Sequence, residues 1–132
     1  MAANQVMTTK QVIDAYYENV NKGDWDSWLT LFTDDIVIDE QLAGHSEGIK
    51  VLREGVGGLK RGYSKFLMHP VHTVVDGDKG VVIWHCEAAN AAGAPIDARG
   101  ANYFEMRNGR IAYMANFHDS VPFRPFLDQK LD

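Results

Sequence analysis

The sequence predicts an α+β fold in which three N-terminal helices cover a curved antiparallel sheet. Helical periodicity dominates the first half of the chain, alternation of apolar and polar residues dominates the second half, and tight-turn signals separate the alternating segments. The 132 residues suit one domain, 1–132, since domains average roughly 100–200 residues. Hydrophobic residues make up 45% of the chain and charged residues 23%, which is a globular rather than a disordered composition.

The first helix has clear signals at both ends. Thr8 and Gln11 have the spacing of a capping box, and Gly23 stands where a helix commonly ends in a left-handed residue. The apolar residues between them recur on one helical face at positions 12, 13, 16, 17 and 20. These signals predict a helix that begins just after Thr8 and ends just before Gly23.

Two further helices are expected before the sheet-forming half of the chain. A short one follows Asp24, which can cap it, and carries apolar residues up to Phe32 before the acidic pair 34–35 ends it. Another follows a glycine-containing loop over residues 44–48. Interior glycines cost a helix about 1 kcal/mol each relative to alanine, so the three glycines at 55, 57 and 58 leave its C-terminal end open.

Five strands are predicted from β-branched and alternating segments. Pro70 lies inside the second of them and favours an edge position or a bulge, because proline cannot donate to a sheet ladder. Asn108 and Gly109 are the strongest hairpin signal in the chain. The tail VPFRPF, 121–126, is too apolar to be a free end. The strands are expected at residues 36–40, 66–75, 80–89, 95–106 and 110–117.

Charge and hydropathy exclude several classes of function. Thirteen basic and eighteen acidic side chains give a net charge of −5, which disfavours wholesale binding to phosphate backbones, so no nucleic-acid partner is expected. No apolar run approaches the ~20 residues that a membrane-spanning helix needs, so no membrane partner is expected. Residues 1–5 lack the pattern of a secretory signal. We therefore expect a cytoplasmic protein in which Cys86, the one cysteine, stays reduced and forms no intrachain disulfide.

Neither a metal nor another cofactor is expected. The chain has five histidines, but no H-E-x-x-H or comparable ligand cluster. His69 and His72 are three residues apart on a predicted strand, and odd spacing places their side chains on opposite faces. A basic stretch at 50, 53, 60, 61 and 65 is interpreted as a solvated helix face, with steering of an acidic or phosphorylated substrate as the alternative.

Strand alternation singles out Glu40 as a candidate general base. It shares a face with Ile36 and Ile38, and a carboxylate on a core-facing row is costly unless it is paired or has a purpose. Burial among apolar side chains raises a carboxyl pKa toward the range in which a general base works best. The alternative is that Glu40 lies at the end of its strand in bulk water.

A second row also carries a polar residue among apolar ones. In the fourth strand Asn102 shares a face with Phe104 and with the small residues Ala98 and Gly100, which leave volume for a ligand cavity. In the last strand both rows are mixed, and the pattern does not choose between them. One of these rows holds Met114, Asn116 and His118.

Four segments resemble the NTF2-like superfamily, and within it the ketosteroid isomerases and the SnoaL-like polyketide cyclases. The segments YYENVNKGD at 16–24 and FTDDIVIDE at 32–40 resemble its opening, and NGRI at 108–111 with NFHD at 116–119 resembles its final hairpin. The resemblance extends over roughly 9–119. It implies a cone-shaped fold and a homodimer.

The resemblance also implies roles for individual residues. Ketosteroid isomerases use an Asp base and an oxyanion hole made of a Tyr and a protonated Asp. The matching positions here are Glu40 for the base, with Tyr16 and Asn102 as oxyanion donors; His118 is a further catalytic candidate, whose alternative is a strand-end histidine satisfied by Asp119. In the cyclases the acid and base would fall near Asn102 and Asn116, where amides cannot act as bases. Candidate contacts to a substrate are Trp28, Phe104, Met114 and Asn116, with core packing as the alternative for Trp28.

Two functions follow from these residues. The first is a small-molecule enzyme in which a carboxylate base and neutral hydrogen-bond donors transfer a proton on a hydrophobic carbonyl compound, in an isomerisation or an aldol-type ring closure. The alternative is a non-catalytic NTF2-like protein that binds a small molecule or acts as a dimer scaffold. The amides Asn102 and Asn116 favour this alternative. In either case a homodimer is suited by the apolar tail, 121–126, and by the exposed back of the sheet, with Tyr103 and Tyr113.

Overall fold

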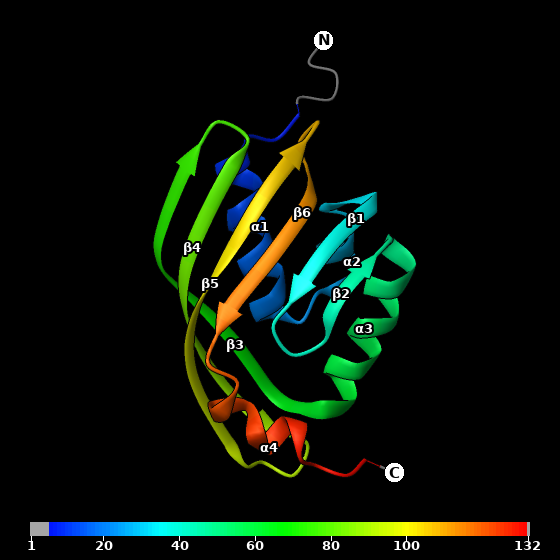
Figure 1. Ribbon diagram of the computed structural model, residues 1–132, viewed down its shortest axis with the longest axis vertical. Coiled ribbons are helices and arrows are strands. Elements are labelled where there is room, and N and C mark those ends of the chain that lie inside the picture. The colour runs from blue at the N-terminus through cyan, green and yellow to red at the C-terminus, as the bar shows by residue number, and fades with distance from the viewer. Residues whose placement is uncertain (1–5, 132) are drawn as a thin grey trace.

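The computed structural model describes residues 6–131, and a curved six-stranded sheet forms its largest element (Figure 1). Residues 1–5, which lack a secretory pattern, lie outside the described part of the chain. Over 6–131 no helix has the length and apolarity needed to cross a bilayer. The elements in chain order are α1 (Thr9–Lys22), α2 (Trp25–Leu29), β1 (Phe32–Glu40), β2 (Gly44–Glu47), α3 (Ile49–Gly62), β3 (Tyr63–Asp76), β4 (Lys79–Asn90), β5 (Pro95–Arg107), β6 (Arg110–His118), η1 (Val121–Phe123) and α4 (Arg124–Leu127).

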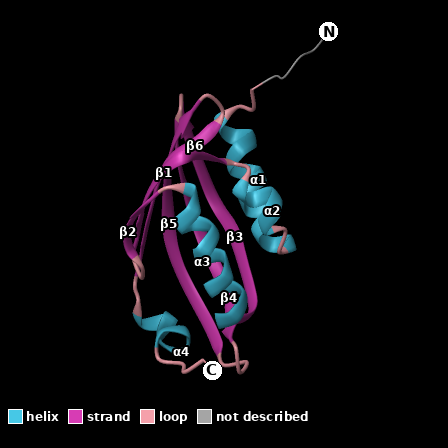
Figure 2. Cartoon of the chain, turned by 90° about the vertical axis from the view of Figure 1, so that its right-hand side faces the viewer, coloured by secondary structure: helices cyan, strands magenta, loops and turns pink. Residues whose placement is uncertain are grey.

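The predicted α+β class is confirmed, and the sheet is mixed rather than wholly antiparallel. Its order is β2-β1-β6-β5-β4-β3, and β1 runs parallel to β6 while every other neighbouring pair is antiparallel. Helices α1, α2 and α3 lie together on the concave side, as Figure 2 shows, and α4 lies at the end of the sheet where the chain terminates. The sheet does not close, so the helices complete the wall of a cone.

The signals read for the first helix are confirmed. Thr8 accepts a hydrogen bond from the Gln11 amide and donates its own amide to the Gln11 side chain, which completes the capping box. Gly23 ends the helix with a φ of 70°, a left-handed conformation that favours glycine. The buried face of α1 packs against β3 and β4 and contributes to the core through Val12, Ile13, Tyr16, Tyr17 and Val20.

The boundary between the second helix and the first strand is corrected. Helix α2 ends at Leu29, and Phe32 together with the acidic pair 34–35 lies in β1 rather than at a helix end. Phe32 pairs in register with Ile111 of β6, and the Ile111 amide donates to the carbonyl of Leu31. This pairing with a strand almost 80 residues away outweighs the local helical pattern.

Strand β2 was not predicted; the expected loop over 44–48 pairs with β1 instead. It is short, exposed and polar, with the sequence GHSE, so it lacks the apolar alternation that marks a half-buried strand. The predictions for the later turns are confirmed. The register of edge strand β3 shifts between Pro70 and His72, and Asn108 and Gly109 have the positive φ values, 52° and 76°, of a two-residue hairpin.

The core lies between the concave face of the sheet and the helices, and Gly100 is required for its packing. A Cβ atom at Gly100 would lie 2.6 Å from Cζ2 of Trp84 and 2.7 Å from the carbonyl oxygen of Phe117. The indole of Trp84 therefore lies directly over the backbone of β5. Its Nε1 donates to Oδ1 of Asn102 at 3.0 Å, so the position of the indole also determines the hydrogen bonding of the buried amide.

We predict that Gly100→Ala lowers the free energy of unfolding by about 1–3 kcal/mol, because the added methyl group must displace the Trp84 ring. Chemical denaturation would measure it. The control is Gly58→Ala in α3, where a Cβ atom meets nothing within 4 Å and stability should not fall. Equal stability of Gly100→Ala and the wild type would contradict the packing described.

Candidate functional site

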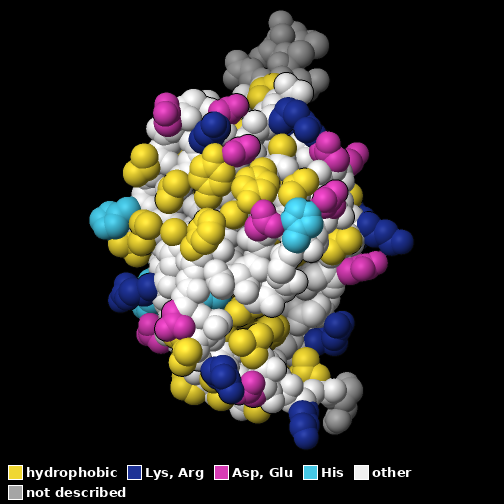
Figure 3. All heavy atoms as spheres, viewed as in Figure 1, with side chains coloured by type: hydrophobic (Ala, Val, Ile, Leu, Met, Phe, Trp, Pro, Cys, Tyr) yellow, Lys and Arg dark blue, Asp and Glu magenta, His cyan; other side chains and the backbone are white. Residues whose placement is uncertain are grey.

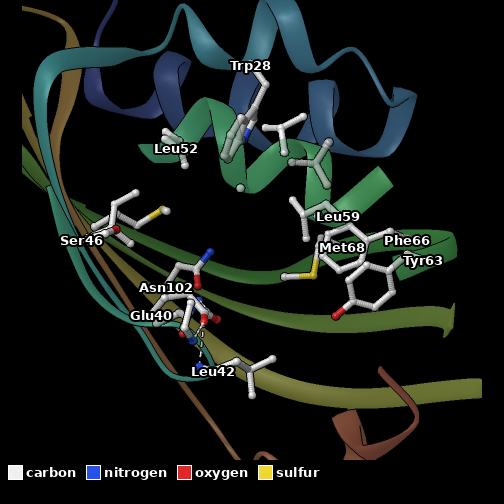
Figure 4. A pocket seen from close by; sticks show the side chains of 18 of the residues that line it. Trp28, Glu40, Leu42, Ser46, Leu52, Leu59, Tyr63, Phe66, Met68 and Asn102 are labelled. Atoms are coloured by element: carbon white, nitrogen blue, oxygen red, sulfur yellow. Dashed lines mark hydrogen bonds between the residues drawn. The ribbon is translucent and has the colours of Figure 1, made fainter. Parts of the chain in front are cut away.

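A cavity of about 570 Å³ lies between the concave face of the sheet and the helices (Figure 4). This volume is typical of sites that bind small molecules. Most of its wall is apolar and comes from α2, α3, β3 and the C-terminal segment. The polar side chains of the lining include Glu40, Asn116 and His118, which lie together at the ends of β1 and β6, with Asn102 beside them on β5 and with His45 and Ser46 on β2.

Glu40 lies at the end of β1 and points into this cavity, as the alternation of β1 predicts. Its side chain is 26% exposed, so it is neither sealed in the core nor placed in bulk water. One carboxylate oxygen, Oε2, accepts hydrogen bonds from the backbone amides of Leu42 (2.7 Å) and Ala43 (2.5 Å). The other, Oε1, accepts from Nδ2 of Asn116 at 3.1 Å. The carboxylate therefore stabilises the turn between β1 and β2 and faces β6.

His118 is the nearest ionisable partner of Glu40. Its side chain is 2% exposed, and Nε2 lies 3.9 Å from Oε1 of Glu40. Its Nδ1 lies 3.0 Å from the carbonyl oxygen of Asp119, and because a carbonyl only accepts, Nδ1 carries a proton. Nε2 is thus the nitrogen that can gain or lose a proton beside Glu40. The ring packs against Phe123, with centroids 4.6 Å apart.

The two groups shift each other's pKa in opposite directions. Burial alone would raise the pKa of Glu40, but the nearby His118 and hydrogen bonds from Ala43, Asn116 and Leu42 outweigh it and hold that pKa below its ordinary value. The expectation of a raised carboxyl pKa is therefore wrong, because sequence alternation shows the burial but not the donors. Burial likewise lowers the pKa of His118, yet the nearby Glu40 carboxylate and the hydrogen bond to the Asp119 carbonyl raise it above its ordinary value. The arrangement therefore favours the carboxylate form of Glu40 and the imidazolium form of His118, each over a wider pH range than in the isolated side chain.

Asn116 positions the carboxylate. Besides donating to Glu40, it accepts a hydrogen bond from the backbone amide of Gln41 through Oδ1 at 2.8 Å. One amide side chain on β6 thus binds both Glu40 and the residue after it. Asn116 was expected to contact the substrate. In the structure it lies at the cavity wall, and its hydrogen bonds hold the Glu40 carboxylate in position.

Asn102 belongs to a buried hydrogen-bond network that includes Tyr17, which the sequence analysis did not identify as a site residue. Its side chain is 2% exposed; Oδ1 accepts from Trp84 and Nδ2 donates to the hydroxyl of Tyr17 at 2.9 Å. Tyr16, the expected oxyanion tyrosine, lines the cavity with its ring 5.2 Å from that of Phe104. Burial raises the pKa of Tyr16, and the negative charge of Glu40 raises it further, so its hydroxyl stays a neutral donor.

The remaining candidates divide between the cavity and the core. Trp28 and Met114 line the cavity, whereas Phe104 is fully buried behind Tyr16 and does not. Part of the wall comes from aromatic residues that were not singled out as site residues, although the apolar tail had indicated that this end packs against the fold. These residues are Tyr63 and Phe66 of β3 and Phe123 and Phe126 of the C-terminal segment. Within residues 6–131, no group of three or more His, Cys, Asp or Glu side chains could hold a metal ion.

Comparison with solved structures finds the same fold in several other proteins. A candidate polyketide cyclase from Pseudomonas putida KT2440 superimposes with a TM-score of 0.81 at 18% identity, over 95% of this chain and 99% of that one. An NTF2-like protein of unknown function from Burkholderia pseudomallei K96243 gives 0.84 at 14% identity, over 92% and 98%. TerC, co-crystallised with polyporic acid, gives 0.81 at 19% identity, over 92% and 98%.

Sequence comparison identifies the family. A search of curated proteins finds no match. The model of the SnoaL-like domain matches residues 13–114, which is more than half of the 132 residues and includes Glu40, Asn102 and the helices that cover the cavity. Together with the NTF2-like cone, this match shows that the chain belongs to the SnoaL-like domain family.

Proposed function

We propose that this protein is a small-molecule enzyme in which Glu40 and His118 transfer a proton at a carbon beside a carbonyl group. The observation that carries the proposal is an ionisable pair 3.9 Å apart at the wall of an apolar cavity. Such a pair can act as base and acid at once, and general acid–base catalysis commonly contributes about 10²–10⁴-fold to a rate. The similarity in fold to a candidate polyketide cyclase supports the proposal that this protein is an enzyme.

The reaction begins with Glu40 as carboxylate and His118 as imidazolium. The carboxylate takes a proton from the carbon next to the substrate carbonyl, and the electron pair of the broken C–H bond moves to form the enolate. Tyr16, held neutral by burial, is available to donate a hydrogen bond to the enolate oxygen. Nε2 of His118 can give its proton to an oxygen that becomes negative.

The pair can then return to its starting state. Where the substrate carries a C=C bond that makes the enolate a conjugated dienolate, return of the proton from Glu40 to the γ-carbon gives an isomer in which the double bond has moved. In an aldol-type closure the enolate carbon forms a bond to a second carbonyl carbon, and His118 protonates the resulting alkoxide. The proton on Glu40 then passes to Nε2 of His118, which the 3.9 Å separation allows with a small movement.

A second candidate function is ligand binding without turnover. The observation that favours it is that both oxygens of Glu40 already accept hydrogen bonds, from Leu42, Ala43 and Asn116. A carboxylate bound in this way can serve simply to hold the turn between β1 and β2 and to fix the cavity wall. The experiments below separate this structural role from proton transfer.

We predict that Glu40→Gln slows proton exchange on a ketone by at least a hundredfold, because glutamine cannot accept the carbon-bound proton. The probe is 2-tetralone, a flat apolar ketone with acidic C–H groups. Loss of its α-proton signals in D₂O would be followed by NMR with and without protein, so the natural substrate need not be known.

The matched control is Asp35→Asn on the same strand. Asp35 is exposed and pairs with Arg107, away from the cavity, so this variant should exchange at the wild-type rate. Circular dichroism would show whether each variant is folded. Catalysis by folded Glu40→Gln at the wild-type rate, or no catalysis by the wild type above buffer, would favour the binding function.

The exchange rate should depend on pH as a bell-shaped curve. The active pair needs Glu40 ionised and His118 protonated, so the acid limb should lie below 4.5, the ordinary pKa of glutamate, and the alkaline limb above 6.5, that of histidine. An NMR titration of the His118 ring would measure its pKa directly. In Glu40→Gln this pKa should fall, because burial still lowers it and one of the groups that raise it is gone. A wild-type His118 pKa at or below 6.5 would refute the proposed charge state.

We further propose that two copies associate through the outer face of the sheet. Hydrophobic side chains gather on this face (Figure 3), with Ile83 of β4 next to Ala101 of β5, and Ala101 next to Phe117 of β6. Ile83 is 42% and Phe117 59% exposed, which is unusual for two large apolar side chains on neighbouring parts of one surface.

Phe117→Glu should therefore shift the sedimenting species from a dimer toward the 14.8 kDa monomer at micromolar concentration, since a charge in the contact must be desolvated. Leu131→Glu, at an exposed apolar residue near the C-terminus, is the control and should leave the dimer intact. A wild-type protein that sediments only as the monomer would contradict the proposal.

A further inference from the structure

One polar group of the cavity has no role in the proposed reaction and lies apart from the Glu40–His118 pair. Tyr63, the first residue of β3, lines the cavity, and Figure 4 shows its hydroxyl directed inward, toward the side where Asn102 and Glu40 lie. Among the described residues this hydroxyl has no hydrogen-bond partner. Its surroundings are apolar and include Met68 and Leu59.

The ring of Tyr63 is held on two sides. It stacks on Phe126 with the centroids 4.3 Å apart and the planes within 6° of parallel, and it lies 4.7 Å from the ring of Phe66. The close approach of Phe126 depends on Gly62, where a Cβ atom would lie 2.3 Å from Cε2 of Phe126. The hydroxyl is thus presented in a fixed direction, as a binding group requires.

The C-terminal segment that carries Phe126 is itself bound to the rest of the fold. Asn90 donates to the carbonyl of Pro125 at 2.8 Å, and Gln129 donates to the carbonyl of Gly62 at 2.9 Å. These bonds hold Phe126 against Tyr63 from both ends of the segment. The stack is therefore part of the ordered wall.

The chemistry of this hydroxyl is that of a neutral donor. Burial raises the pKa of Tyr63, so the phenol is protonated at neutral pH. A donor that faces an apolar space without a partner recovers about 0.5–1.5 kcal/mol when an acceptor reaches it. A carbonyl or hydroxyl oxygen of a ligand is such an acceptor.

We infer that Tyr63 is a specificity-determining residue, which binds an oxygen at the end of the substrate remote from the reacting carbonyl. The substrate is then a flat apolar compound with an oxygen function at each end, one at Glu40 and His118 and the other at Tyr63. This inference rests on the proposed function for the assignment of the reacting end.

Pairs of phenols that differ by one hydroxyl test this inference. The pairs are 2-naphthol with 2,6-dihydroxynaphthalene, and 4-phenylphenol with 4,4′-dihydroxybiphenyl, which present two different spans. A single hydroxyl should bind at Glu40, because hydrogen bonds to a charged acceptor are the stronger ones. Quenching of tryptophan fluorescence reports binding, since Trp28 and Trp84 line the cavity.

In Tyr63→Phe, the Kd of the diol should rise about three- to tenfold in at least one pair, while the Kd of its mono-ol stays unchanged. Gly62→Ala should have the same selective effect by displacing Phe126, whereas Gly57→Ala, which lies outside the cavity lining and where a methyl group meets only the flexible end of Arg61, should not. Equal changes for mono-ol and diol, or no change for either diol, would overturn the inference.

The exchange of 2-tetralone keeps this test separate from that of the proposed function. That ketone has a single oxygen, so its exchange tests Glu40 and requires no change at Tyr63. Failure of Glu40→Gln to slow the exchange would count against proton transfer, and it would leave the diol preference of Tyr63 as an independent measurement.

Discussion

The parallel pairing of β1 with β6 is the constraint on which the site depends. Ile38 pairs with Met114 and Asp39 with Ala115, so the next residues along the two strands, Glu40 and Asn116, come side by side on the concave face. His118 follows Asn116 by two residues on β6, so its ring lies on the same face and beside Glu40. A slip of one residue in either strand would turn one of these polar side chains to the outer face of the sheet, because side chains alternate with a period of two.

This arrangement explains why a charged group is tolerated in an apolar wall. Each oxygen of Glu40 has at least one donor, from the turn after β1 or from β6, and His118, when protonated, supplies a compensating charge. Buried charges are stable only when they are paired and hydrogen-bonded in this way. Asn102, Trp84 and Tyr17 satisfy one another in the same manner on the neighbouring strand, without any charge.

Much of the fold could be predicted from the sequence because its signals are local. The cap at Thr8, the left-handed Gly23 and the hairpin at Asn108 each depend on residues within a few positions. Alternation also placed Glu40 and Asn102 on the concave face. The direction of the Glu40 pKa could not be predicted, because it depends on donors 76 and 78 residues away. Strand β2 was missed for a related reason: its strand character comes from its partner rather than from its own sequence.

The stack of Phe126 on Tyr63 has a consequence for how this fold can diversify. The sheet fixes Glu40, Asn116 and His118, whereas a few residues after the last strand form one end of the cavity wall. Changes in the length or bulk of that tail would alter which molecules fit, while the residues that bond to Glu40 stay in place. Relatives with the same polar cluster and different tails would then accept compounds of different length.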